Sequence, residues 1–400
     1  MKLAFYYHYA VLRRDGALLL PGFLGVFVDS LAAGVESLFL VMHTIEEDQQ
    51  GIYDYTLKSK NIHCIEIGPR TPAWHRHFFH RKILSAAQTT INACDVLLVR
   101  SPSPLAPFLA KICKSCLPVF LVVGDYAQTA REKKIKGLRD QLILQYNLHF
   151  DRIFRKSMRS TDIVVNSPAL YRTYESFAKS IFQVRTTTLS AKDIFIRPDV
   201  FTGKEIHLLY TGRFDRNKGL FECLEAFRDL FQKHPQMRLN FVGWDASKDQ
   251  SVLNQLKAKA VEYGVQHQVI FHGKKAVGAE LNAVYQQSDI YLLASYHEGF
   301  PRTIWEAMAN GLPVIATKVG AIPDYLRHEE DAMLINPRNV SQIVDAVETL
   351  LSNELLRKKL IQNGYELAKQ NTLEIQSKIL LDRLLALKNK QISNEGTTIQ

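Results

Sequence analysis

Short apolar runs alternate with longer segments of helical period in the second half of the chain. The apolar runs lie at residues 206–211, 238–242, 269–272, 289–294, 313–316 and 332–335. The helical patterns between them include residues 218–232, 251–263 and 340–351. Strands that are apolar at nearly every position belong to parallel sheets that helices cover on both faces. We therefore predict a doubly wound α/β domain over residues 200–370.

The first half shows a rougher version of the same pattern. Its predicted strands lie at residues 3–7, 37–42, 95–99, 119–123 and 163–165. We predict a second Rossmann-like α/β domain over residues 1–190, with the connection between the domains inside residues 183–199. An amphipathic segment at 372–389 has no strand partner. We predict that it is a helix packing back on the N-terminal domain, followed by a disordered tail at 391–400.

The composition is that of a folded protein. The 400 residues are 46% hydrophobic and 22% charged, and they are too many for one ordinary core. No apolar run reaches the roughly 18–20 residues of a membrane-spanning helix, and the N-terminus lacks a signal-peptide cleavage site. Five scattered cysteines are typical of reduced thiols in a cytoplasmic protein, and we interpret Cys113 and Cys116 as small residues near a helix end.

Positive charge is concentrated in the first half. Residues 1–200 hold 26 Lys and Arg against 17 Asp and Glu, whereas residues 201–400 hold 24 against 23. An aromatic and basic stretch lies at 74–82 (WHRHFFHRK) and a basic one at 131–139 (REKKIKGLR). Such faces suit peripheral contact with the cytoplasmic side of an anionic membrane, although a solvated surface gives the same pattern. We expect no nucleic-acid partner, because no binding module is visible.

The stretch at 296–325 carries the clearest candidate chemistry. A predicted strand ends before Gly299 and Pro301, and a helix is predicted to start near Arg302, which turns backbone N–H groups toward a ligand. Glu298 precedes this helix and Glu306 lies about one turn inside it. The two carboxylates can accept hydrogen bonds from vicinal hydroxyls of a sugar and of a ribose, or they can be ordinary helix-start glutamates.

A second candidate site follows the predicted strand at 206–211, in the sequence GRFDRNKG. Gly212 permits a tight turn, and Arg213 and Lys218 flank a loop that opens the next helix. A guanidinium and an ammonium near a helix N-terminus suit a diphosphate, although two surface cations would give the same pattern.

These motifs together resemble the retaining glycosyltransferases of family 4, which have the GT-B fold of two Rossmann-like domains facing each other across a cleft. The resemblance is specific over residues 208–337. It rests on the spacing of Glu298 and Glu306, on the loop from Gly212 to Gly219, and on the segment EAMANGLPVIATKVGAIPDYL. The segment departs from the family at Ala321 and Asp324, where glycine and glutamate are usual.

The resemblance implies roles for particular residues. It implies that Arg213 and Lys218 neutralise the departing diphosphate, and that Glu298 holds the donor sugar. The implied donor-binding residues are Gly22, Gly25, Gly212, Gly273, Lys274, Gly299, Phe300, Pro301 and Glu306. Glu306 would bind the ribose. No metal and no cofactor is implied, since the nucleotide sugar is a substrate.

Acceptor chemistry is expected in the N-terminal domain. The sequence Pro21 to Gly25 resembles the family's glycine-rich first loop. Asp125 stands near the position where relatives place a histidine or an acid, so it is a candidate general base as well as an ordinary turn residue.

The resemblance implies hexosyl transfer with retention, from a nucleotide diphosphate sugar to a saccharide or lipid-linked acceptor. Surface polysaccharide, lipopolysaccharide or glycolipid biosynthesis is the expected setting. Two alternatives stay open, a protein of the same fold that binds nucleotide sugar without transfer and a nucleotide-sugar epimerase. A dehydrogenase is excluded because no GxGxxG follows a predicted strand.

Overall fold

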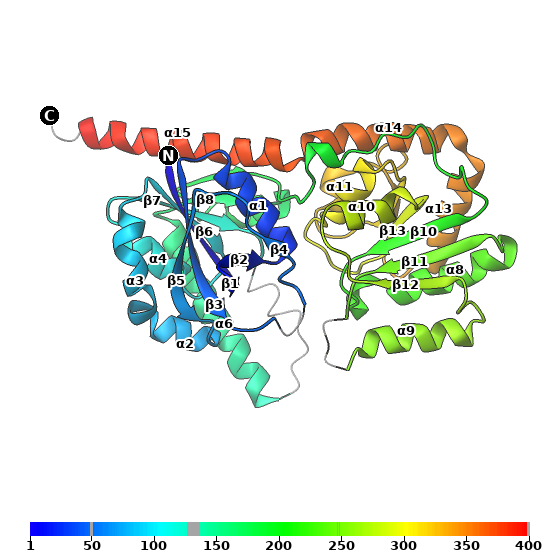
Figure 1. The fold of residues 1–400 in the computed structure, drawn as a ribbon, viewed down its shortest axis with the longest axis horizontal. Coiled ribbons are helices and arrows are strands. Elements are labelled where there is room, and N and C mark those ends of the chain that lie inside the picture. The colour runs from blue at the N-terminus through cyan, green and yellow to red at the C-terminus, as the bar shows by residue number, and fades with distance from the viewer. Residues whose placement is uncertain (49–50, 126–136, 246, 248, 398–400) are drawn as a thin grey trace. The chain divides into compact units, whose positions relative to one another are not determined.

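The computed structural model describes residues 1–48, 51–125, 137–245, 247 and 249–397. The chain divides into two units (Figure 1). The N-terminal unit comprises Met1–Thr186 together with Gln376–Gln400, and the C-terminal unit comprises Thr187–Ile375. Each unit is built on a sheet of mainly parallel strands covered by helices, which confirms the predicted α/β class with two Rossmann-like domains.

The C-terminal unit contains a parallel sheet in the order β12-β11-β10-β13-β14-β15. Its strands are β10 (Ile206–Thr211), β11 (Met237–Val242), β12 (Val269–Gly273), β13 (Ile290–Leu293), β14 (Val314–Thr317) and β15 (Met333–Ile335). Its helices are η1 (Ala191–Asp193), η2 (Arg216–Lys218), α8 (Leu220–Lys233), α9 (Ser251–Glu262), α10 (Ala279–Gln286), α11 (Thr303–Ala309), α12 (Ile322–Tyr325), α13 (Val340–Ser352) and α14 (Glu354–Gln370). Each apolar run of the second half is a strand, and in all but the edge strand β12 most side chains are buried, as in a sheet covered on both faces.

The order in which the chain adds strands to this sheet changes direction at β10. The chain adds β11 and β12 on one side of β10, then crosses over and adds β13, β14 and β15 on the other side. Helices α8 and α9 lie below the sheet and α10 and α11 above it in Figure 1. Ligands of doubly wound sheets bind at the carboxyl ends of the strands where the order reverses, which here lies between β10 and β13.

The N-terminal unit contains a larger sheet. Its strands are β1 (Lys2–Arg14), β2 (Ala17–Leu20), β3 (Ser37–Ile45), β4 (Tyr55–Thr56), β5 (Ile62–Pro69), β6 (Val96–Ser101), β7 (Leu117–Val122), β8 (Asp162–Val165) and β9 (Ser180–Gln183). Parallel pairing runs in the order β5-β3-β1-β6-β7-β8-β9, and β2 and β4 add antiparallel pairs beside β1. Its helices are α1 (Gly22–Ala32), α2 (Ala73–Phe78), α3 (His80–Asn92), α4 (Ala106–Ile112), α6 (Leu138–Met158) and α7 (Pro168–Tyr174).

Alternating residues of the N-terminal strands face two separate cores. Ala4 and Tyr6 of β1 pack with side chains of α3, α4 and α6, whereas Leu3 and Phe5 pack with α1. The last helix, α15 (Leu373–Thr397), contributes Leu380, Leu381 and Leu384 to this second core.

Three sequence-based expectations need correction. The tail predicted to be disordered at 391–400 is helical as far as Thr397, because no proline interrupts the helical pattern of α15. The glycine-rich segment expected as a loop at 21–25 instead begins helix α1, with Pro21 as its N-cap. Cys113 and Cys116 are joined in a disulfide, because the turn after α4 brings their Cα atoms to 5.4 Å. Cys64, Cys94 and Cys223 are free.

Within the described ranges, no helix has the length and apolar character needed to cross a membrane.

A glycine fixes how closely the loops after β10 and β11 approach. Gly243 has a φ of +145°, and a Cβ added there would lie 1.7 Å from the carbonyl oxygen of Gly212.

We expect Gly243→Ala to lower the free energy of unfolding by about 2–4 kcal/mol. Thermal unfolding followed by circular dichroism measures this. The control is Gly264→Ala, whose φ is +70° but which has nothing within 4 Å of the added Cβ. Equal shifts in the two variants would contradict the steric explanation.

Candidate donor site of the C-terminal unit

An ion pair joins the loops on the two sides of the point where the strand order reverses. Lys218 ends η2 after β10, and Glu298 follows β13. The Lys218 Nζ lies 2.6 Å from the Glu298 Oε1, and both side chains are largely shielded from solvent. The parallel sheet therefore brings together two of the residues that the sequence singled out, although they are 80 positions apart.

The backbone of the first loop is set by local capping. The Asp215 side chain accepts a hydrogen bond from the Asn217 N–H at 2.8 Å and so starts η2. Gly219 then adopts a left-handed conformation with a φ of +64°, and its Cα approaches the strand end so closely that a Cβ would lie 2.0 Å from the Ala294 carbonyl oxygen. This contact holds Lys218 against the loop that carries Glu298.

Glu298 is held from a second side. The Ser295 hydroxyl donates to Glu298 Oε1 at 2.8 Å, the same oxygen that Lys218 contacts. Within the described residues Oε2 has no hydrogen-bond partner, so it is the oxygen on which a sugar hydroxyl could donate. Gly320, with a φ of +57°, lies against the Glu298 carbonyl, and the Ala321 N–H donates to the Gly299 carbonyl at 2.8 Å.

Aromatic packing orders the segment after Glu298. Gly299 has open space around its Cα, and Pro301 precedes α11. The ring of Phe300 stacks on Trp305 with the centroids 4.4 Å apart, and it meets Tyr325 edge to face. Phe300 is therefore a fixed wall of this loop rather than a free side chain.

Glu306 lies in the first turn of α11 and is buried. The Thr188 hydroxyl donates to its Oε1 at 2.5 Å, and the Tyr285 hydroxyl donates to its Oε2 at 3.0 Å. The burial raises the pKa of Glu306, although these two donors partly oppose the shift. The sequence did not point to Thr188 or Tyr285, because they come from segments distant from Glu306 and no local motif marks them.

The remaining predicted residues of this unit lie at the same edge of the sheet. Arg213 follows Gly212 after β10, its side chain is exposed, and none of the described carboxylates forms an ion pair with it. Gly273 ends β12 with a φ of +70°, and the next residue, Lys274, holds its ammonium 5.7 Å from the ring centroid of Trp244. An exposed cation, a lysine–glutamate pair and an aromatic face thus lie at the ends of adjacent strands.

The predicted residues of the N-terminal unit have partners of their own. The Gly22 N–H donates to Asp54 Oδ1 at 2.7 Å. A Cβ on Gly25 would lie 2.2 Å from a ring carbon of Tyr55, so packing inside this unit explains that glycine. Asp125 lies 3.4 Å from the Arg155 guanidinium and forms an ion pair with it. The roles of these three residues stay predictions.

No metal site is evident in the part of the chain that the structure describes, since no three His, Cys, Asp or Glu side chains are grouped there as ligands.

Comparison with known proteins agrees with this geometry. Residues 192–367 match the family model described as Glycosyl transferases group 1. Protein CapJ of Staphylococcus aureus is 26% identical over 333 residues, which are 80% of this chain and 78% of CapJ. D-inositol 3-phosphate glycosyltransferase of Corynebacterium jeikeium is 32% identical over 150 residues, which are 37% of this chain and 36% of that enzyme.

Solved structures agree in fold. The structure of HepE from Anabaena in complex with UDP aligns with 96% of this chain and 100% of its own, with a TM-score of 0.72 and 15% identity. WaaG, a glycosyltransferase involved in lipopolysaccharide biosynthesis, aligns with 96% of this chain and 99% of its own, with a TM-score of 0.65 and 16% identity. The two parallel-sheet units and these neighbours define the GT-B fold. The model of the group 1 glycosyl transferases covers most of the C-terminal unit, so this unit is similar to that family.

The buried carboxyl of Glu306 leads to a pH prediction. Its pKa is raised in the folded chain, so the folded state binds this proton more tightly than the unfolded state does. Above the ordinary glutamate pKa the wild type therefore loses stability as pH rises, by up to about 1.4 kcal/mol for each unit of the shift. Glu306→Gln lacks this loss, so the melting temperature of the variant minus that of the wild type should increase between pH 4.5 and 7.5. A difference that stays constant or decreases would contradict the raised pKa.

Proposed function

We propose that the chain transfers a sugar from a nucleoside diphosphate sugar to an acceptor hydroxyl with retention of the anomeric configuration. The observation that carries the proposal is the Lys218–Glu298 pair between the ends of β10 and β13, in a unit that matches the group 1 family. A cation for the leaving group and a carboxylate for sugar hydroxyls lie 2.6 Å apart there.

The proposed reaction breaks the bond between the anomeric carbon and the diphosphate oxygen and forms one between that carbon and the acceptor oxygen. The diphosphate leaves with the electron pair of the broken bond, and the acceptor hydroxyl loses its proton. Lys218 and the exposed Arg213 stabilise the charge that develops on the leaving oxygen. Glu298 holds the sugar through Oε2, and Glu306 takes the ribose by exchanging a hydrogen bond from Thr188 or Tyr285.

We propose further that the N-terminal unit contacts an anionic membrane through a surface on α2 and α6. Its exposed apolar side chains, the α2–α6 surface, are Trp74, Phe78, Phe79, Leu138, Leu142 and Ile143. The His77 ring lies 6.1 Å from the Tyr146 ring, which places α2 beside α6. Exposed cations, Arg81 and Lys82 at the start of α3 and Arg139 on α6, complement anionic headgroups.

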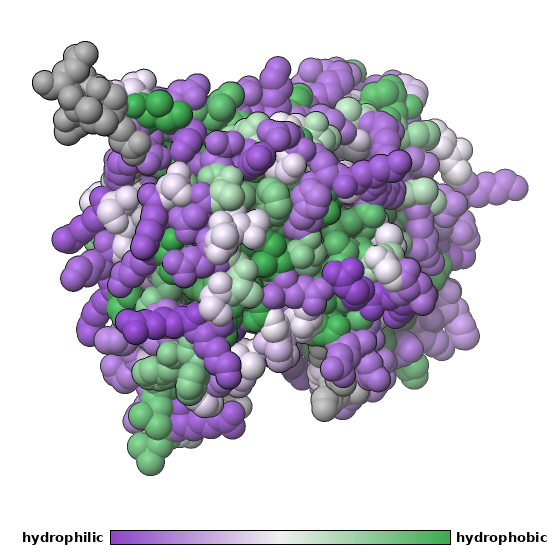
Figure 2. All heavy atoms as spheres, turned by 60° about the vertical axis from the view of Figure 1, so that its left-hand side comes forward, coloured by the Kyte–Doolittle hydropathy of each residue, from purple (hydrophilic) through white to green (hydrophobic). Residues whose placement is uncertain are grey.

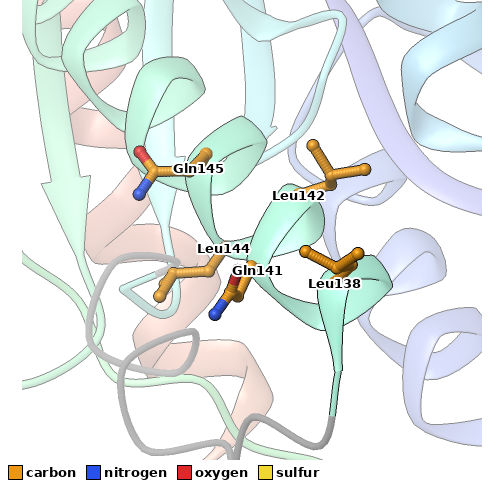
Figure 3. A pocket seen from close by; sticks show the side chains of 5 residues that line it. All are labelled: Leu138, Gln141, Leu142, Leu144 and Gln145. Carbon is orange, nitrogen blue, oxygen red and sulfur yellow. The ribbon is translucent and has the colours of Figure 1, made fainter.

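The α6 end of this surface is unusually apolar for a helix that leaves the body of its unit. Leu138 is 80% exposed and Leu142 is 72% exposed. Figure 3 shows Leu138 and Leu142 on one side of α6 and Gln141 and Gln145 on the other side. All four side chains line a pocket along this helix. Hydrophobic atoms also gather at the lower left of Figure 2, where this helix projects. Most of the basic stretch at 131–139, which precedes α6, lies outside the described residues.

The donor proposal predicts the effect of removing the leaving-group cation. We expect Lys218→Ala to reduce turnover about 10²–10³-fold, because the developing charge on the diphosphate loses its partner. Turnover is measured as release of nucleoside diphosphate from a donor sugar without added metal. Arg216→Ala is the matched control, since Arg216 belongs to the same η2 but its guanidinium donates to Gln255 and lies over the Phe221 ring.

Binding is followed separately in a thermal-shift panel of nucleoside diphosphates, with UDP as the first probe because HepE was solved with it. Near-normal turnover in Lys218→Ala would remove Lys218 from the catalytic residues. Donor binding by the wild type without turnover would favour a protein that binds nucleotide sugar and transfers nothing.

The membrane proposal predicts weaker vesicle binding when the leucines of α6 are made polar. We expect the double variant Leu138→Gln, Leu142→Gln to bind vesicles of phosphatidylcholine and phosphatidylglycerol at least about tenfold more weakly in co-sedimentation. Leu355→Gln is the control, because Leu355 is 84% exposed but lies on α14 of the C-terminal unit. Unchanged binding in the double variant would refute the α2–α6 surface.

A further inference from the structure

The N-terminal sheet holds a group of arginine and histidine side chains toward the carboxyl ends of its own strands. His8 lies on β1, His43 on β3 and Arg100 on β6, Arg70 directly follows β5, and Arg76 lies on α2. The chain places β3 and β5 on one side of β1 and then crosses over to β6. The order of this sheet therefore reverses between β1 and β6, so these five residues, the cationic cluster, lie where a doubly wound sheet binds its ligand.

The arginines of the cationic cluster lack acidic partners. Arg76 is only 6% exposed, yet its Nε and Nη1 have no hydrogen-bond partner. The buried Nε of Arg100 is also without one, although its Nη1 donates weakly to the Pro102 carbonyl at 3.4 Å. Within the described ranges, no carboxylate forms an ion pair with Arg70, Arg76 or Arg100. A buried guanidinium without acceptors is costly, so its retention indicates a ligand that supplies them.

The histidines of the cluster show how close the charges are. Burial lowers the pKa of His8 to about 2. The positive charges of Arg100, Arg70 and Arg76 lower this pKa further, in that order. Burial likewise lowers the pKa of His43 to about 4. Both rings are therefore neutral near pH 7, and the positive charge belongs to the arginines. His43 Nδ1 lies 3.2 Å from the Gly68 carbonyl, while its buried Nε2 has no partner.

Aromatic rings support two of the guanidinium groups. The β1–β3 register shifts between Tyr6 and Ala10, where the segment from Tyr7 to Tyr9 bulges. The Arg100 guanidinium lies 5.4 Å from the Tyr7 ring centroid, and that of Arg70 lies 5.8 Å from the Tyr9 ring centroid. Rings at this distance attract the cation without neutralising it, so they hold the arginines and leave their charge for a ligand.

We propose that the cationic cluster binds a phosphate group, which belongs to the sugar acceptor. Three uncompensated guanidinium groups match a phosphate dianion, whereas a carboxylate would balance only one of them. The assignment to the acceptor rests on the proposed function, but the binding of phosphate does not. A water-soluble sugar phosphate and a lipid phosphate present the same group, and the test separates them.

The test measures binding of glycerol 3-phosphate to the full-length chain by calorimetry. We expect Arg76→Gln and Arg100→Gln to weaken binding about 10- to 100-fold, the usual effect of losing hydrogen bonds to a charged group. Arg159→Gln, at an exposed arginine that caps the C-terminal end of α6, is the matched control and should bind as the wild type does. Lys218→Ala should also bind normally, because its change lies in the donor site. Phosphate binding that depends on Lys218 and not on Arg76 would overturn the proposal.

Melting without phosphate distinguishes a binding role from a structural one. Removing an unpaired buried charge should leave the melting temperature of Arg76→Gln equal to or above that of the wild type. A structural arginine would lower it instead, and a large decrease would overturn the proposal. Arg100→Gln gives a second test if Arg76→Gln does not fold.

Vesicles that carry phosphatidic acid identify the source of the phosphate. Binding that requires Arg76 and exceeds the binding of glycerol 3-phosphate assigns the site to a lipid phosphate, whereas preference for glycerol 3-phosphate assigns it to a soluble one. Vesicle binding that depends on Leu138 and Leu142 alone, with no Arg76-dependent binding of either probe, would refute the phosphate site.

Discussion

Parallel strand pairing is the constraint on which both candidate sites depend. Parallel neighbours must be joined by crossovers, so the loops that follow the strands meet at one edge of each sheet. Where the order of strands reverses, the loops on the two sides diverge and leave room for a ligand. Lys218 and Glu298 meet in this way after β10 and β13, and the cationic cluster forms where the strand order reverses between β1 and β6. Gly219 and Gly320 complete the first site, because only glycine lets those loops touch neighbouring backbone at positive φ.

The apolar pattern predicts strands well only where both faces of a strand are buried. Five of the six strands from β10 to β15 meet this condition in most of their residues, and they were predicted. The sixth, the edge strand β12, is buried only at Val269, but its short apolar run was predicted too. The outer strand β5 pairs only with β3 and carries the exposed side chains His63 and Glu66, so its apolar run is broken and it was missed. The prediction of β1 stopped at Tyr7 because a bulge with a histidine interrupts the alternation there.

The candidate donor residues were found because a family motif places them at fixed spacing, but their partners were not. Lys218, Glu298 and Glu306 belong to two short segments that the sequence marks. Thr188 and Tyr285 act only through the folded arrangement that brings them to Glu306. Gly25 shows that a motif glycine can also have a packing reason, since an added Cβ would meet the Tyr55 ring; its predicted role in ligand contact stays a prediction. The cationic cluster has no local signature at all, because its five residues come from four strands or strand ends and one helix.

The two sites differ in how their charge is balanced, and this difference sets what a ligand must do in each. In the C-terminal unit Lys218 already has Glu298 as a partner, so a diphosphate exchanges one partner for another and the net gain on binding is modest. Selectivity there must come from geometry and from interactions that strengthen only as charge develops on the leaving group. In the N-terminal unit the buried Nε and Nη1 of Arg76 have no hydrogen-bond partner among the described residues, so the chain without ligand carries the cost of a poorly compensated buried charge. An anion that enters this cluster removes that cost and adds its own hydrogen bonds, which couples ligand binding to the stability of the N-terminal unit. The candidate donor site therefore has its charges paired before any ligand binds, whereas the proposed phosphate supplies the partners that the cationic cluster lacks.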